Sequence, residues 1–144
     1  MNLTPHLHHL LLAHAGTTLF MTGLIWTIQV VHYPLFAYVG VEGYERYQQL
    51  HVQRITWVVM PVMLAELLCA VLLLRSHLNT QPTLWVASAL LALIWASTAL
   101  LQVPAHEALA KGWNAEAHAR LVGSNWLRTL AWSARSVIAL WLLR

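Results

Sequence analysis

The sequence predicts an all-α integral membrane protein, folded as a four-helix bundle. Hydrophobic residues make up 59% of the 144-residue chain and charged residues only 9%, whereas soluble domains carry about 25% charged residues. Four segments reach the roughly 20 apolar residues that a membrane-spanning helix needs. Because lipid offers no partners for backbone N–H and C=O groups, we expect the four helices to pack together as one domain over residues 1–144.

The four predicted spans run over residues 10–31, 52–74, 82–103 and 121–143. The segment before the first span lacks the Lys and Arg of a signal peptide, so we expect it to be the mature start of that helix. Spans two and three are joined by the short connection RSHLNTQP. The other two connections are longer and polar, and we expect them to contain short interfacial helices.

The two halves of the chain align with each other when the sequence is shifted by 69 positions. Two LIW tripeptides then coincide, starting at Leu24 and Leu93, as do two LLR tripeptides, starting at Leu73 and Leu142. One interpretation is a duplicated two-helix unit, with parallel repeats related by an axis along the membrane normal. The alternative is chance, because Leu and Trp are common in this chain.

Glu66 and Arg135 are charged residues deep inside predicted spans, and the same shift aligns them. Each lies nine positions before a matched arginine, which places it about 13 Å inside that end of its helix. A single charge at that depth costs at least about 2.5–3.5 kcal/mol, so we predict that the two side chains pair. The pair either links spans two and four structurally, or orients a ligand or relays a proton.

Histidines collect at the membrane face that carries the two long connections. Each predicted span brings one histidine there: His32, His51, His106 and His118. Neutral imidazole is a common metal ligand, and bundles often build metal and cofactor sites between facing helices. We therefore predict that these residues bind iron, copper or haem, or transfer protons. Headgroup contact and loop capping are the alternatives, since no His-Glu-x-x-His motif occurs.

Other polar side chains at the same face complete the predicted site. Arginine offers a rigid fork for carboxylates, phosphates or haem propionates and can neutralise negative charge in a reaction. The expected catalytic residues are Tyr33, Glu107, Arg54 and Arg128. The residues expected to position a ligand or cofactor are Gln29, Asn125, Glu66 and Arg135. For the two interfacial arginines, the alternative is that their side chains simply extend to the membrane surface.

Four short motifs mark the predicted spans. They are the polar exit His32–Pro34 from span one, His51 with Pro61 in span two, STALLQVPAHEALA at the end of span three, and NWLRTLAW in span four. These motifs resemble those of the small four-helix bacterial membrane proteins grouped with anthrone oxygenases. Ala105 and His106 follow Pro104 where that family tends to have Thr-Asn, so the likeness is to a sister group. The resemblance implies oxidation of a hydrophobic aromatic substrate.

These patterns predict a small, oxygenase-like membrane oxidoreductase that acts on an aromatic or quinone-like molecule. A non-catalytic subunit of a larger membrane complex and a small-anion carrier are the alternatives. The expected partners are lipids, a hydrophobic small molecule, and further copies or other membrane subunits. No basic run indicates nucleic acid. The expected location is the bacterial inner membrane with cytoplasmic termini, although the Lys and Arg counts do not fix the orientation.

Overall fold

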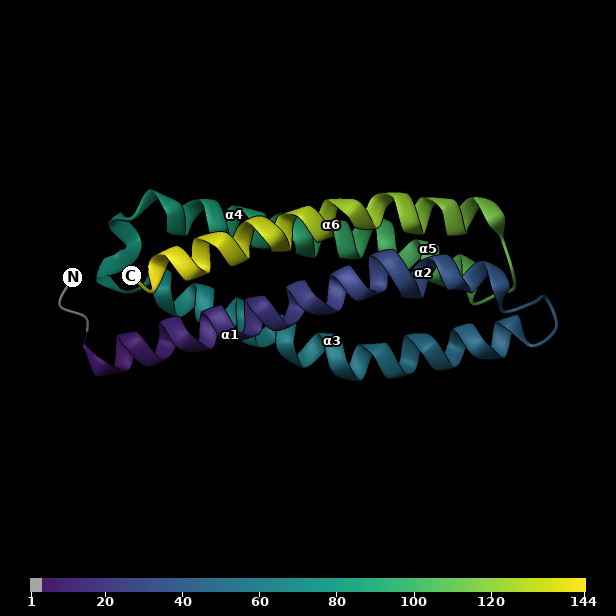
Figure 1. Ribbon diagram of the computed structural model, residues 1–144, viewed down its shortest axis with the longest axis horizontal. Coiled ribbons are helices and arrows are strands. Elements are labelled where there is room, and N and C mark those ends of the chain that lie inside the picture. Colours follow the sequence, from purple (N-terminus) through teal and green to yellow (C-terminus); the bar gives the residue numbers. More distant parts are fainter. Residues whose placement is uncertain (1–3) are drawn as a thin grey trace.

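The computed structural model describes residues 4–144 and confirms the all-α four-helix bundle (Figure 1). Its first long helix comprises α1 (Pro5–Thr27), the π-helical turn η1 (Ile28–His32), α2 (Tyr33–Leu35) and the 3₁₀ turn η2 (Phe36–Tyr38). The second is α3 (Tyr44–Leu74). After the 3₁₀ turn η3 (His77–Thr80), the third comprises α4 (Pro82–Ser97), the π-helical turn η4 (Thr98–Gln102) and α5 (Val103–Leu109). The fourth is α6 (Ala115–Leu142).

Within residues 4–144, three of the long helices are apolar enough to cross a membrane: Pro5–Tyr38, Tyr44–Leu74 and Pro82–Leu109. By length and composition, these helices indicate an integral membrane protein. The fourth predicted span, within α6, is long enough but does not reach the same hydropathy. The reason is that α6 carries polar side chains toward the bundle interior, including Asn125, Arg128 and Arg135. The outer surface is apolar, with more than half of Leu68, Leu100 and Val137 exposed, as expected for a surface covered by lipid.

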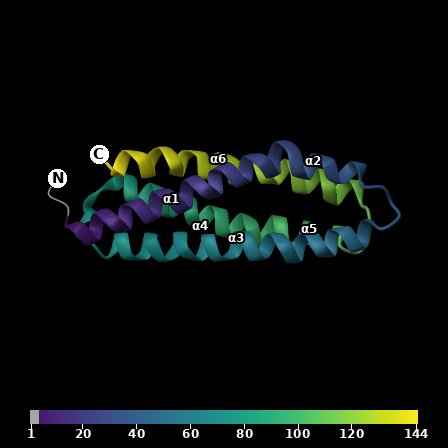
Figure 2. The ribbon, with the colours of Figure 1, turned by 60° about the horizontal axis from the view of Figure 1, so that its bottom comes forward.

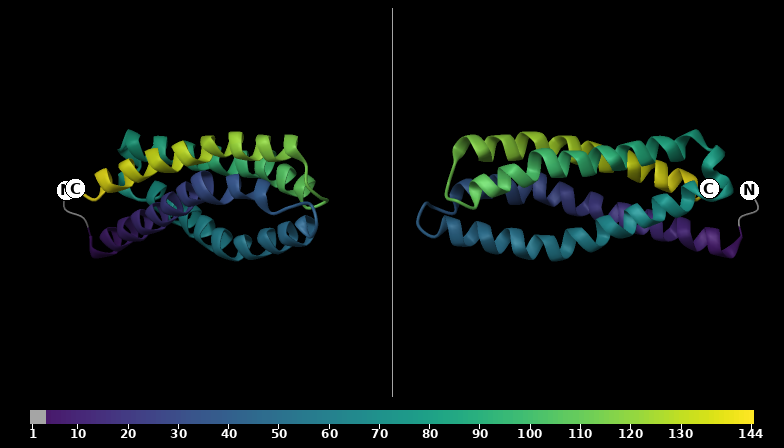
Figure 3. Two further views of the ribbon diagram at one scale, coloured as in Figure 1. Left: turned by 45° about the vertical axis from the view of Figure 1, so that its right-hand side comes forward. Right: turned by 180° about the vertical axis from the view of Figure 1, so that it is seen from behind.

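The helices extend beyond the predicted spans at the end with the long connections. The second begins at Tyr44 and the fourth at Ala115, several residues before the predicted starts. The polar segments therefore continue the helices instead of forming separate interfacial ones. Glycines with positive φ, Gly40, Gly43 and Gly112, sit in the remaining turns, where residues with a Cβ are strained. The start of α1 and the C-terminus lie at the opposite end of the bundle (Figures 2 and 3).

Each π-helical turn precedes a proline by one intervening residue. Pro34 and Pro104 have no N–H and cannot continue the α-helical hydrogen-bond pattern. The backbone widens instead, and Tyr33 N–H and Val103 N–H each donate to the carbonyl five residues earlier. Such turns leave other carbonyls free for side chains and occur often at functional sites. The Tyr33 carbonyl, just after η1, accepts hydrogen bonds from the Phe36 N–H and from a side chain of α6.

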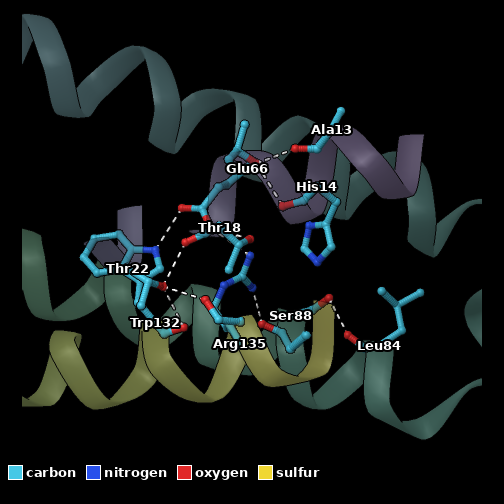
Figure 4. A network of polar contacts seen from close by, with 12 residues as sticks. Ala13, His14, Thr18, Thr22, Glu66, Leu84, Ser88, Trp132 and Arg135 are labelled. Atoms are coloured by element: carbon cyan, nitrogen blue, oxygen red, sulfur yellow. Dashed lines mark hydrogen bonds and ion pairs between the residues drawn. The ribbon is translucent and has the colours of Figure 1, made fainter. Parts of the chain in front are cut away.

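The predicted Glu66–Arg135 pair is present and fully buried. The Arg135 Nη2 atom lies 3.2 Å from Glu66 Oε1, and Arg135 Nη1 donates to the Ala87 carbonyl of α4. Glu66 also accepts hydrogen bonds from Thr18 Oγ1 at 2.9 Å and from Trp132 Nε1 at 3.0 Å. Figure 4 shows these side chains pointing toward one another from α1, α3 and α6. The network therefore joins all four long helices at one depth.

The same contacts support the duplication interpretation. Glu66 and Arg135 are 69 positions apart and touch, as residues beside a two-fold axis would. Their further partners, Thr18 and Ala87, are also 69 positions apart. Each half of the chain also contains a π-helical turn followed by a proline. The duplication itself stays a prediction.

Candidate intramembrane binding site

A cavity of about 490 Å³ lies between α1, α3, α4–α5 and α6. Most of its wall is aliphatic or aromatic, with Ile25, Val59, Met63, Trp95 and Trp132 among the lining residues. Exposed side chains also line it, namely Thr56 and Met60 of α3 and Val103 and Glu107 of α5. The cavity therefore opens between α3 and α4–α5, and its exposed rim combines apolar Met60 and Val103 with polar Thr56 and Glu107.

One part of the cavity wall is polar and is formed by Tyr33, His106 and Arg128, here called the polar wall. His106 Nε2 lies 3.0 Å from Tyr33 Oη, and Arg128 Nη2 donates to the same oxygen at 3.4 Å. Gln48 Nε2 donates to His106 Nδ1 at 2.8 Å. A Gln side-chain N–H can only donate, so Nδ1 is the acceptor and neutral His106 carries its hydrogen on Nε2. His106 therefore donates to the Tyr33 hydroxyl oxygen.

Side-chain amides on the side of Arg128 away from the cavity fix the orientation of its guanidinium group. Its Nε atom donates to Asn125 Oδ1 at 3.0 Å, and Nη2 donates to the same oxygen. Asn125 Nδ2 in turn donates to Gln29 Oε1 at 2.8 Å. Gln29 Nε2 donates to the Val122 carbonyl at 3.2 Å. The predicted ligand-positioning residues Gln29 and Asn125 thus orient the arginine from the side away from the cavity.

Three of the four predicted histidines converge. His32 Nε2 lies 3.0 Å from His51 Nδ1, and the rings of His51 and His106 have centroids 5.5 Å apart. His118 lies apart from them, and its Nε2 atom bonds to the Tyr33 carbonyl at 2.8 Å.

The histidines are arranged as hydrogen-bonded side chains more than as a metal centre. His32 and His51 share one hydrogen bond through facing nitrogens, and both nitrogens of His106 have protein partners. Among residues 4–144, no three His, Cys, Asp or Glu side chains are grouped so that they could hold a metal ion. Structural and catalytic metal sites commonly use at least three protein ligands. Within residues 4–144 these histidines therefore form no evident set of metal ligands, and the binding of iron, copper or haem stays a prediction.

The structure brings only part of the predicted site to the cavity. Tyr33, His106, Glu107 and Arg128 line it. The other predicted site residues lie elsewhere: His32, His51 and His118 beside the polar wall, Gln29 and Asn125 behind Arg128, and Glu66 and Arg135 in the deep ion pair. Arg54 is exposed on α3 and is not among the lining residues. Its place in the first turns of the predicted span did not reveal which face of the helix it occupies.

Sequence reasoning missed Gln48, the residue that fixes the tautomer of His106. It lies in the segment YERYQQLH, which was expected to belong to the connection before span two and is the first part of α3. Gln48 is fully buried. Its spacing to His51 gave a usable signal, because residues three apart share a helix face. Reading that segment as a continuation of span two would have placed Gln48 and His51 on one helix face.

No protein-family model, curated protein or solved structure matches this chain. The resemblance to the proteins grouped with anthrone oxygenases therefore stays a prediction, as do the predicted partners and orientation. The cavity, the polar wall and the groups that hold them are the features of the molecule that bear on function.

Proposed function

We propose that this protein is a small membrane oxidoreductase that binds a hydrophobic aromatic or quinone-like molecule in the cavity. The observation that carries the proposal is the combination of a mostly apolar cavity, open at the bundle surface, with the polar wall at one side. Such a combination is typical of small-molecule sites, in which few polar groups orient a ligand held mostly by apolar contact. A flat ring fits beside Trp95 and Trp132, which both line the cavity.

The polar wall supplies hydrogen-bond donors and a positive charge for an oxygen atom on the ring. In this proposal, the bound ring enters in its quinol form and is oxidised to the quinone, and dioxygen accepts the two electrons and two protons. The Tyr33 hydroxyl and the Arg128 guanidinium donate hydrogen bonds to the ring oxygen and stabilise negative charge on it. His106 donates its Nε2 hydrogen to the Tyr33 oxygen at 3.0 Å, which leaves the hydrogen of the Tyr33 hydroxyl free to be donated to the ligand. Gln48 keeps His106 in the tautomer that makes this donation.

The two alternative functions are less well supported. An anion carrier would use Glu66 and Arg135, but this pair is fully buried and neither residue lines the cavity. A purely structural subunit leaves unexplained a cavity of about 490 Å³ with a charged side chain in its wall. Cavities of this kind lower stability, so one is expected to persist where a ligand uses it.

Filling the cavity is expected to weaken ligand binding. The double variant Val52→Phe/Val59→Phe places two rings in the cavity wall. We expect it to weaken the binding of 2-methoxy-1,4-naphthoquinone by at least about tenfold, because the ligand and the new rings compete for one space. Binding is measured as saturable quenching of tryptophan fluorescence in detergent, to which Trp95 and Trp132 contribute.

The matched control carries the same change on the outer surface of the same helix. Val58 and Val71 are exposed on α3 and are not among the lining residues. We expect Val58→Phe/Val71→Phe to bind the naphthoquinone as the wild type does. Equal quenching curves for all three proteins, or no saturable quenching of the wild type, would refute the proposed function and favour the structural-subunit alternative.

A further inference from the structure

Arg128 is a buried cation without a carboxylate partner. Only 6% of its surface is exposed, and its hydrogen-bond partners Asn125, Thr98 and Tyr33 are all neutral. The Trp132 ring lies with its centroid 6.0 Å from the guanidinium carbon and compensates the charge in part. Over residues 4–144, no Asp or Glu oxygen lies within 4.0 Å of Arg128, whereas Arg135 pairs with Glu66.

An unpaired guanidinium at this position is costly, because burial removes the water that stabilises a charge. The chain compensates its other buried arginine with a carboxylate and surrounds this one with neutral groups. Arg128 also lines the cavity, whereas Arg135 does not. A ligand bound in the cavity can therefore supply the negative charge that Arg128 lacks.

Two hydrogen-bond donors are left free at this point of the wall. Arg128 Nη1 carries two hydrogens and has one protein acceptor among residues 4–144, Thr98 Oγ1 at 3.3 Å. The Tyr33 oxygen accepts from His106 and from Arg128, so its own hydrogen remains available. Both side chains line the cavity. The site therefore offers two donors and a positive charge to one ligand oxygen.

We infer that the ligand of this cavity is a hydrophobic organic anion, whose ionised oxygen pairs with Arg128 and accepts a hydrogen bond from Tyr33. Phenolates, enolates and carboxylates attached to an apolar ring have this chemistry. The inference rests on the proposed function, since it requires that the cavity binds a ring. It adds that the bound form is charged, which the apolar lining alone does not indicate.

Two naphthoquinones that differ in charge test the inference. The 2-hydroxy compound is ionised at pH 7, whereas 2-methoxy-1,4-naphthoquinone has a similar ring and no charge. We expect wild-type protein to bind the 2-hydroxy compound about ten- to a hundredfold more tightly, the range expected for a hydrogen-bonded charge. Equal affinities for the two compounds, or tighter binding of the neutral one, would overturn the inference while leaving the proposed function intact.

Variants of Arg128 test whether this residue causes the preference for the anionic naphthoquinone. Arg128→Gln is expected to abolish the preference for the anion while still binding the neutral compound, and Arg128→Lys to retain part of it. Arg120→Gln, an exposed change on the same helix, is expected to leave the preference unchanged. A folded Arg128→Gln protein that still prefers the anion would overturn the inference. Failure of the wild type to bind either compound would instead refute the proposed function.

Discussion

Replacing Glu66 with leucine is expected to lower the free energy of unfolding by about 3–5 kcal/mol, because it leaves the Arg135 charge buried without a partner. The change also removes the acceptor of hydrogen bonds from Thr18 and Trp132. All four long helices meet at this network, so we expect the whole bundle to loosen. The measurement is reversible unfolding in mixed detergent, followed by circular dichroism.

Two further variants separate the ion pair from general disruption. Glu66→Leu/Arg135→Leu removes both charges, and we expect it to be more stable than Glu66→Leu alone. Glu116→Gln breaks the exposed pair with Arg120 and is expected to cost no more than about 1 kcal/mol. A Glu66→Leu protein as stable as Glu116→Gln would show that the buried pair does not hold the bundle together.

Replacing Trp132 with alanine is expected to cost about 3–5 kcal/mol of stability, because a fully buried indole is removed. Trp132 is 0% exposed, donates to Glu66 Oε2 and lines the cavity. Its loss therefore enlarges the cavity and removes one hydrogen bond from the ion pair. We expect the unfolding transition and the binding of 2-methoxy-1,4-naphthoquinone to weaken together in this variant.

Trp141 supplies the control on the same helix. It is about half exposed on α6 and is not a lining residue, so Trp141→Ala is expected to change stability and binding little. Trp132→Phe keeps most of the ring volume and removes the indole N–H. We therefore expect its stability and its naphthoquinone affinity to lie between those of Trp132→Ala and Trp141→Ala. Unchanged naphthoquinone affinity in Trp132→Ala would mean that the ligand does not reach the aromatic part of the cavity.

Much of the fold follows from hydropathy, but the helix ends do not. Apolar runs locate the middle of each long helix, because only regular helix satisfies the backbone in lipid. Hydropathy is uninformative where α3 and α5 leave the apolar region, since a polar helix and a polar loop have similar composition. The π-helical turns also escape prediction. Pro34 and Pro104 mark a disturbance of the helix, but sequence alone does not distinguish a widened turn from a kink or an end.

The candidate site was predictable in its location more than in its contacts. The depth of Glu66 and Arg135 predicted their pairing correctly, because two charges at one level in lipid have few other partners. The sequence placed four histidines at one membrane face but did not indicate that His32, His51 and His106 come together without His118. The position of Arg54 outside the cavity was not predicted, because the rotation of the helix decides which way an interfacial side chain points. The neutral surroundings of Arg128 depend on contacts among three helices and require coordinates.

A structure of the wild-type protein with bound 2-hydroxy-1,4-naphthoquinone tests the central claim most directly. We expect the ring between α3 and α4–α5, beside Trp95 and Trp132, with an oxygen within hydrogen-bond distance of Arg128 Nη1 and Tyr33 Oη. A ring bound on the outer surface of the bundle, with Arg128 paired to a carboxylate of the protein, would contradict it.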